Sequence, residues 1–127
     1  MNADMTPGTT PDMASDKTPD MTEVSITVTV HDGRVHIVLV GEVDLANADA
    51  VAREITGAIT NRTSAAVVDL SGVTYLDSAG LHVMFELAAR LPTLQIELEL
   101  IAPPGSQVRR VMEISGLTTV TTVTPDA

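Results

Sequence analysis

Strand-like and helix-like segments alternate along the chain after its first 23 residues, and this order constrains the fold more than any other feature. Residues 24–30 (VSITVTV) and 34–41 (RVHIVLVG) flank the turn signal HDG at 31–33, which predicts an antiparallel hairpin. Apolar runs at 65–70 (AAVVDL) and 94–102 (LQIELELIA) then alternate with segments of helical spacing. This order predicts an α/β fold, in which parallel strands and crossover helices follow the hairpin in one mixed sheet of four to five strands.

Three helices are expected between and after these strands. The first follows Asn47 as its N-cap, and the third ends at the C-cap signal Gly116. The second follows Asp77 as its N-cap, ends at Pro92 and buries a stripe of apolar side chains at helical spacing: Leu81, Met84, Phe85, Ala88 and Leu91. The segment SGVTY at 71–75 is expected to bend the chain between the strand before it and this helix.

Tails are predicted on both sides of this domain. Residues 1–22 combine Thr, Pro, Asp, Met, Ser and Ala without a period or a branched aliphatic residue, which indicates a disordered N-terminal tail. Residues 23–123 form the predicted domain, and residues 124–127 form a short C-terminal tail.

Composition excludes several classes of function. Aromatic residues make up 2% of the chain and the net charge is −10, so the chain offers few stacking surfaces for bases and repels phosphate backbones. There are no cysteines, which excludes disulfides and thiol chemistry. No signal peptide and no apolar run long enough to span a bilayer is present, so we expect a cytoplasmic protein without a membrane partner. The same charge favours basic protein surfaces as partners.

Ser78 is the residue that most needs an explanation, because it stands where a buried strand gives way to a helix. Its hydroxyl could be a nucleophile, part of a helix start or a phosphate acceptor. Backbone N–H groups at a helix start lack partners within the helix, so a phosphate on Ser78 is expected to find donors there. The simpler alternative is that Asp77 and Ser78 only cap and begin the helix.

Serine catalysis is tested by the neighbouring residues. A nucleophile elbow needs glycine two residues before and two after the serine, but Leu76 stands before it and only Gly80 fits. His82 lies one helical turn further on, where its ring cannot easily reach back to act as a base. We therefore predict no catalytic residue and no enzyme.

Acidic residues at strand ends are a second candidate site. Glu42, Asp44 and Asp69 are each expected at the end of a strand, so they are expected to gather at one rim of the sheet. Neither their spacing nor that of the histidines supports a specific metal, and no cofactor is predicted. A solvated rim, or an acidic face for a partner's Arg or Lys, is the favoured interpretation over a cation site.

Three motifs together resemble the STAS domains of bacterial anti-sigma factor antagonists. They are VVDLSGVTYLDSAGL at 67–81, GEVD at 41–44 and VRRVMEISGL at 108–117, in the family's order, and the resemblance covers about residues 22–120. It implies partner switching. The unphosphorylated antagonist binds an anti-sigma factor, a serine kinase related to histidine-kinase ATPase domains, and so releases a sigma factor. Phosphorylation breaks the complex, and a phosphatase resets it.

Carried over by motif, the resemblance implies that Ser78 is the phosphoacceptor. The implied partner-binding residues are Asp44, Asp77, Ser78, Ala79, Gly80, Leu81 and His82. Many relatives carry a second Ser or Thr where Ala79 stands, so Ser78 is the sole hydroxyl of this element. A STAS module that senses a small ligand, either a nucleotide or a lipid, is the alternative, as is an accessory subunit of a transporter. The chain has no Gly-rich phosphate loop, which argues against a nucleotide.

Overall fold

The computed structural model describes residues 24–126, and the tail predicted for residues 1–22 lies outside this range. In the described part, five strands form one mixed sheet in the order β1-β2-β3-β4-β5. The strands are β1 (Val24–His31), β2 (Arg34–Val43), β3 (Ala65–Leu76), β4 (Glu97–Ile101) and β5 (Thr122–Thr124). The α/β class and the mixed sheet of four to five strands are confirmed.

The predicted hairpin is confirmed. Strands β1 and β2 pair antiparallel from Val24–Gly41 to His31–Arg34, and every later pair in the sheet is parallel. The two turn residues, Asp32 and Gly33, both have positive φ angles, of 51° and 80°. This is the backbone that a two-residue turn needs to match the twist of the strands, and the Asp-Gly pair supplies it at low cost.

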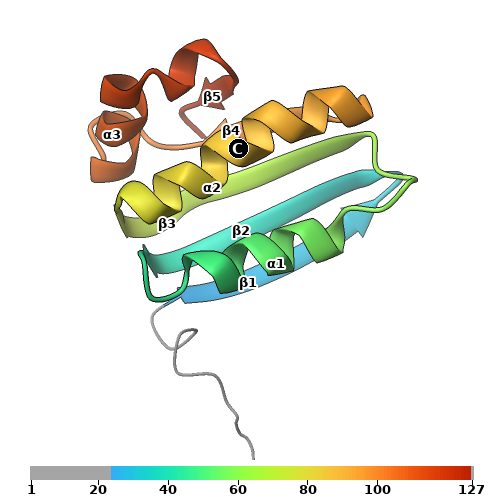
Figure 1. Cartoon of the computed structure of the whole chain (residues 1–127), viewed down its shortest axis with the longest axis horizontal. Coiled ribbons are helices and arrows are strands. Elements are labelled where there is room, and N and C mark those ends of the chain that lie inside the picture. Colours follow the sequence, from blue (N-terminus) through green and yellow to red (C-terminus); the bar gives the residue numbers. More distant parts are fainter. Residues whose placement is uncertain (1–23, 127) are drawn as a thin grey trace, which may run out of the picture.

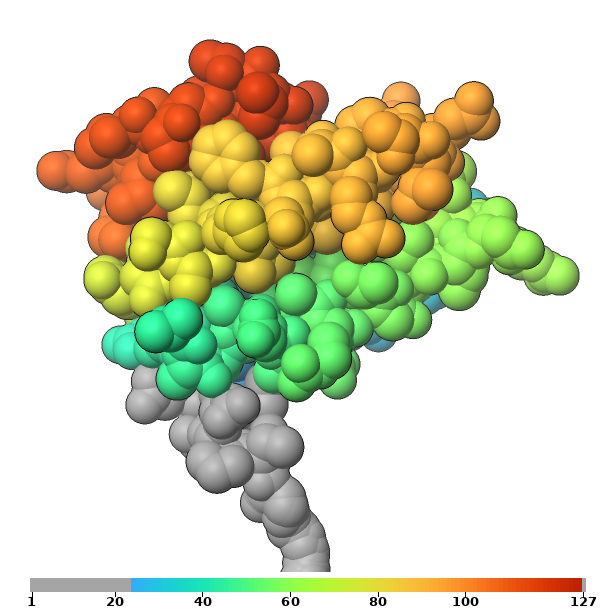
Figure 2. All heavy atoms as spheres, in the orientation of Figure 1, coloured from blue at the N-terminus to red at the C-terminus, as the bar shows by residue number. Residues whose placement is uncertain are grey.

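Three helices connect and cover these strands: α1 (Ala48–Ala58), α2 (Ser78–Arg90) and α3 (Gln107–Ser115). Short 3₁₀ helices, η3 (Leu91–Leu94) and η4 (Leu117–Thr119), follow α2 and α3. Figure 1 shows α1 and α2 side by side over one face of the sheet, with α3 next to the start of α2. The space-filling view shows these helices as one continuous surface (Figure 2).

Strand β3 is longer than predicted. Residues 71–75 do not bend the chain away from the sheet, because β3 continues through them to Leu76. Val73 and Leu76 are buried in the core, while Thr74 and Tyr75 are exposed. The irregularity lies instead in the pairing of β2 with β3, where the register shifts between Val38 and Val40 and again between Gly41 and Glu42.

The buried face of α2 is rotated from the predicted stripe. Met84, Ala88 and Leu91 are buried as predicted, but Leu81 and Phe85 are only half-buried. Buried positions that the stripe missed are Val83 and Leu87. The reason is that α2 contacts α1 as well as the sheet, so two of its sides lose contact with water.

The end of α2 also differs from prediction. The α-helix stops at Arg90 and continues as the 3₁₀ helix η3, which contains Pro92. Gln95 then adopts a left-handed φ of 62°, and β4 begins only at Glu97. Leu94, expected on the buried face of a strand, is therefore exposed in η3.

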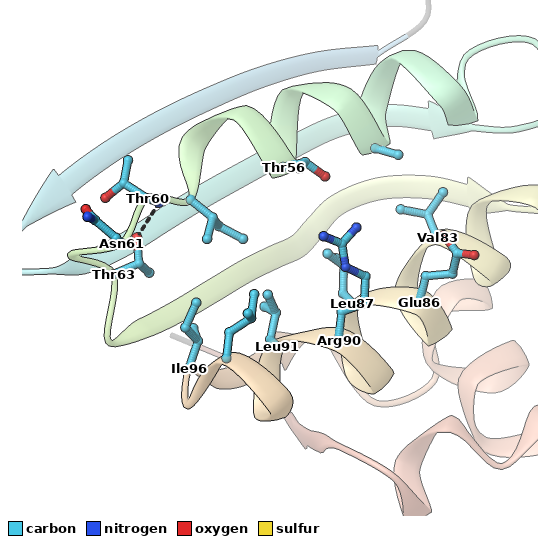
Figure 3. Close-up of a pocket in the computed structure, with 13 residues that line it drawn as sticks. Thr56, Thr60, Asn61, Thr63, Val83, Glu86, Leu87, Arg90, Leu91 and Ile96 are labelled. Atoms are coloured by element: carbon cyan, nitrogen blue, oxygen red, sulfur yellow. Dashed lines mark hydrogen bonds between the residues drawn. The ribbon is translucent and has the colours of Figure 1, made fainter.

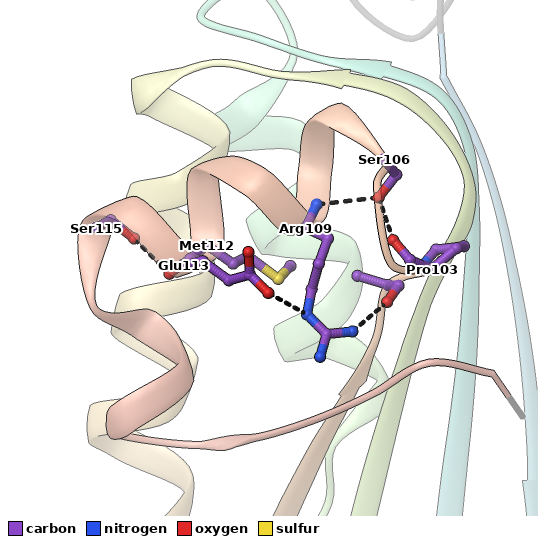
Figure 4. A network of polar contacts seen from close by, with 7 residues as sticks. Pro103, Ser106, Arg109, Met112, Glu113 and Ser115 are labelled. Carbon is purple, nitrogen blue, oxygen red and sulfur yellow. Dashed lines mark hydrogen bonds and ion pairs between the residues drawn. The ribbon is translucent and has the colours of Figure 1, made fainter.

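Helix α3 is fixed to the end of β4 by a local polar network (Figure 4). Ser106 caps the helix, since its Oγ accepts from the N–H of Arg109 at 3.0 Å and donates to the Pro103 carbonyl at 2.7 Å. The Arg109 guanidinium donates to the Ala102 carbonyl at 2.7 Å, and its Nε lies 3.3 Å from Glu113 Oε2. Gly116, with φ of 86°, ends the helix, which confirms the predicted C-cap.

Candidate functional site

Ser78 lies at the edge of the sheet where the parallel strands β2 and β3 end. It is the first residue of α2, so the predicted helix start is confirmed, and its side chain is exposed. In alternating α/β folds, ligands and partners commonly meet this edge of the sheet. The hydroxyl is therefore placed where another protein can reach it.

The Asp77 carboxylate holds together the two segments that surround Ser78. Its Oδ1 accepts from the N–H groups of Ala79 and Gly80, at 2.9 and 3.0 Å, which confirms the predicted N-cap. Its Oδ2 accepts from the N–H of Leu45 at 3.0 Å, across 32 residues of sequence. One side chain thus caps α2 and ties the loop after β2 to it.

The expectation that a phosphate on Ser78 would find free backbone donors is wrong for two of the N–H groups at the helix start. The Asp77 carboxylate already occupies the N–H groups of Ala79 and Gly80. The negative charge of this neighbouring carboxylate opposes the favourable effect of the helix start on a phosphate at Ser78.

The GEVD segment builds the loop that Asp77 holds. Asp44 Oδ1 accepts from the N–H of Ala46 at 3.0 Å. Asn47 Oδ1 accepts from the N–H of Asp44 at 3.0 Å, and its Nδ2 donates to the Glu42 carbonyl at 2.8 Å. Asn47 takes the predicted N-cap position of α1, but its side chain makes no cap hydrogen bond and is 1% exposed. It is turned inward because the loop carbonyl and N–H groups need partners there.

Gly80 lies where α2 approaches the ends of β2 and β3 most closely. A Cβ at this position would lie 2.6 Å from Leu76 Cδ1 and 2.9 Å from the Val43 carbonyl oxygen. Gly80 is buried, so its part in any surface is to let α2 start close to the sheet.

The other residues of the carried-over set differ in exposure. Ser78 and His82 are exposed, whereas Asp44, Asp77, Ala79 and Leu81 are half-buried. His82 Nε2 lies 3.2 Å from Glu86 Oε2, one turn further along α2. The structure thus brings all of these residues except Gly80 to one accessible edge of the molecule.

Gln107 was missed by the sequence analysis. Its side-chain amide, at the start of α3, pairs with the backbone of Leu76 on both sides: Oε1 accepts from the N–H at 2.9 Å, and Nε2 donates to the carbonyl at 3.1 Å. The end of β3 therefore gains a partner from α3, two residues before Ser78. A single glutamine after a Pro-Pro-Gly turn carries no signal for this contact.

A shallow groove of about 480 Å³ runs beside Ser78 between α2 and α3. Its apolar side chains include Tyr75 and Ile114, which are 45% and 78% exposed, and the half-buried Leu81 and Val111. We call it the Ser78 groove; its lining is Tyr75, Leu76, Asp77, Ser78, Leu81, Gln107, Val111, Ile114 and Ser115. Exposed apolar side chains gathered around a polar residue are typical of a protein-binding surface.

The predicted acidic rim is wrong in one residue. Glu42 and Asp44 lie at the end of β2 and just after it, but Asp69 lies within β3, because that strand continues to Leu76. Asp69 Oδ1 accepts from the N–H of Ser71 at 2.9 Å. Over residues 24–126, no group of three or more His, Cys, Asp or Glu side chains is arranged to hold a metal ion. Within the same range, no helix has the length and apolar character to cross a membrane.

The sheet order, the exposed Ser78 at the strand ends and the three sequence motifs agree with the result of comparison with known families. Residues 25–126 match the STAS domain family, and the chain belongs to it. Its relatives include anti-sigma factor antagonists: the anti-sigma-F factor antagonist RsfB of Mycobacterium tuberculosis is 34% identical over 95 residues, which cover 73% of this chain and 76% of RsfB.

Solved structures agree with this assignment. The crystal structure of an anti-sigma factor antagonist from Mycobacterium paratuberculosis has a TM-score of 0.74 and 27% identity, over 85% of this chain and 89% of that one. The Bacillus cell fate determinant SpoIIAA in its phosphorylated form has a TM-score of 0.61 and 21% identity, over 78% of this chain and 90% of that one. At that identity the second likeness shows the fold alone.

Proposed function

We propose that this protein is an anti-sigma factor antagonist that is switched off by phosphorylation of Ser78. In its unphosphorylated form it binds an anti-sigma factor, a serine kinase with an ATPase domain of the histidine-kinase type, and a sigma factor is released. The observation that carries the proposal is the exposed Ser78 hydroxyl, held at the start of α2 beside an apolar groove. The name of the relative RsfB, an anti-sigma-F factor antagonist, supports it.

The modification itself is a phosphoryl transfer. Ser78 Oγ forms a bond to the γ-phosphorus of ATP on the kinase, the bond from that phosphorus to ADP breaks, and the hydroxyl proton is released. Ala79 leaves no competing hydroxyl at the next position. A phosphatase reverses the change by hydrolysis. In this scheme the protein acts in the cytoplasm by binding, and the kinase supplies the chemistry.

The charge at Ser78 explains why phosphorylation would end the complex. Phosphoserine carries about −1.5 to −2 charges at neutral pH, and the Asp77 carboxylate beside it adds another negative charge. Burying such a group in an interface without a cationic partner costs several kcal/mol. A loss of about 3 kcal/mol weakens binding by roughly a hundredfold. The switch therefore needs no large movement of the antagonist.

The test is to incubate the protein with each anti-sigma kinase of its genome and ATP, and to map the modified residue by mass spectrometry. Ser78→Ala is expected to bind the cognate kinase without being phosphorylated. Ser78→Glu is expected to bind about ten- to a hundredfold more weakly. Ser25→Glu, at an exposed serine of β1, is the matched control and is expected to bind normally. Full phosphorylation of Ser78→Ala, or unchanged binding of Ser78→Glu, would contradict the proposal.

A further inference from the structure

A second cavity, of about 470 Å³, lies at the other end of α2 from Ser78 (Figure 3). It opens between α1, α2, η3 and the loop after α1, and we call it the Arg90 cavity. Its apolar floor consists of Ala52, Ile59, Val83, Leu87, Leu91 and Ile96. This volume lies within the range of pockets that hold small molecules, and an apolar floor with few polar groups is their usual composition.

The polar groups of the cavity stand on opposite sides of its opening. Thr56 on α1 and Thr60 and Asn61 in the following loop line one side, and Glu86 and Arg90 on α2 line the other. Figure 3 shows the Arg90 guanidinium pointing from α2 into the space between the two helices. A positive charge at the rim of an apolar pocket is the arrangement that fixes the orientation of an anionic ligand.

Arg90 has no carboxylate partner within residues 24–126. The contacts between basic and acidic side chains of this range join His31 to Asp32, His82 to Glu86 and Arg109 to Glu113. Glu86, the acid nearest to Arg90 on α2, is thus paired on the side of His82. The guanidinium of Arg90, which lines the cavity, is therefore available for an external carboxylate.

We propose that the Arg90 cavity binds a small amphiphile that has an aliphatic body and one carboxylate. The aliphatic body lies on the floor of Val83, Leu87 and Leu91, and the carboxylate accepts hydrogen bonds from Arg90. The lining contains no aromatic side chain to stack on a base and only one cation, so a nucleotide fits it poorly. This inference goes beyond the proposed function and does not depend on it, since the cavity is separate from the Ser78 groove.

The experiment uses the full chain labelled with ¹⁵N and three probes of equal chain length below their micelle concentrations: dodecanoate, dodecan-1-ol and dodecylammonium. Dodecanoate is expected to bind more tightly than the other two and to shift the amide signals of Ala52, Thr56, Leu87 and Leu91. Arg90→Ala is expected to weaken dodecanoate binding about tenfold or more, because it removes a charge-assisted hydrogen bond. Arg90→Lys is expected to retain part of the affinity.

Two variants distinguish binding in the Arg90 cavity from nonspecific binding. Arg53→Ala changes an exposed arginine of α1 that does not line the cavity and is expected to leave dodecanoate binding unchanged. Thr56→Phe is expected to fill the opening and to abolish binding while the protein stays folded. Four results would each overturn the proposal. They are equal binding of the three probes, dodecanoate binding that survives Arg90→Ala, amide shifts confined to residues outside the cavity, and binding of the protein only to anionic vesicles.

Discussion

At the scale of single residues, the neighbours Asp77 and Ser78 have different roles in the site. Ser78 is exposed at the helix start, whereas the Asp77 carboxylate accepts three backbone N–H groups from two segments. The side chain that holds the site together and the proposed phosphoacceptor are thus different residues. A change at Ser78 can alter the charge of the surface without removing any of the hydrogen bonds that shape it.

Asp77→Ala is predicted to destabilise the fold by about 1–2 kcal/mol, because it removes the cap of α2 and leaves the Leu45 N–H without its partner. Urea denaturation followed by circular dichroism measures the loss. Glu54→Ala, at an exposed acid of α1, is the control and is expected to change the free energy of unfolding by less than about 0.5 kcal/mol. A loss equally small for Asp77→Ala would show that the loop and helix are held by other contacts.

Gly80→Ala is predicted to destabilise the fold by about 1–3 kcal/mol, because the new methyl group would lie 2.9 Å from the Val43 carbonyl oxygen. The same substitution at Gly57 is a matched control of opposite sign. A Cβ at Gly57 would have no atom within 4 Å, so Gly57→Ala is expected to stabilise helix α1 by about 0.5–1 kcal/mol. Thermal unfolding of both variants measures these two changes in stability. If Gly80→Ala were neutral, α2 could move outward without cost.

At the scale of elements, the end of β3 is held from two sides. The N–H of Asp77 donates to the Val43 carbonyl of β2 at 3.2 Å, and Gln107 of α3 pairs with Leu76. Helix α3 is in turn anchored through Arg109 to Ala102 at the end of β4 (Figure 4). The junction that presents Ser78 therefore depends on an element that lies 31 residues away from Leu76 in sequence.

Gln107→Ala is predicted to speed hydrogen exchange of the Leu76 amide by about tenfold and to lower stability by about 1–2 kcal/mol, since two backbone groups lose their partner. Native-state hydrogen exchange by NMR measures both effects. Arg110→Ala, an exposed change on the same helix, is the control. If the Leu76 amide kept its protection in Gln107→Ala, water or another group would have replaced the glutamine.

Elements with strong local signals could be predicted from the sequence. The Asp-Gly turn fixes the hairpin, Asp77 fixes the start of α2, and Gly116 fixes the end of α3, because each depends on nearby backbone geometry. The predictions that failed concern contacts between residues that are distant in sequence. Gln107 contacts Leu76 only in the folded chain. The side chain of Arg109 is only 18% exposed because it reaches Ala102.

At the scale of the whole molecule, α2 connects two surfaces of different character. Its first turn borders the Ser78 groove, and its last turn borders the Arg90 cavity. Around both, the chain carries a net charge of −10. Such a charge acts over distances longer than any contact in either site, so it affects how fast a partner arrives more than how firmly it is held.

The association rate with the anti-sigma factor is therefore predicted to fall about tenfold as salt rises from about 0.01 M to about 0.15 M, because the screening length shrinks from about 30 Å to about 8 Å. The dissociation rate is expected to change much less, because the apolar contacts of the Ser78 groove are not screened by salt. Stopped-flow mixing with the cognate partner measures both rates.

Replacing exposed acids of α1 in Asp49→Asn and Glu54→Gln is expected to slow association at low salt and to leave it nearly unchanged at high salt. An association rate independent of salt would contradict a basic partner surface. The same fall in Ser78→Ala would show that electrostatic attraction of the partner does not need the Ser78 hydroxyl.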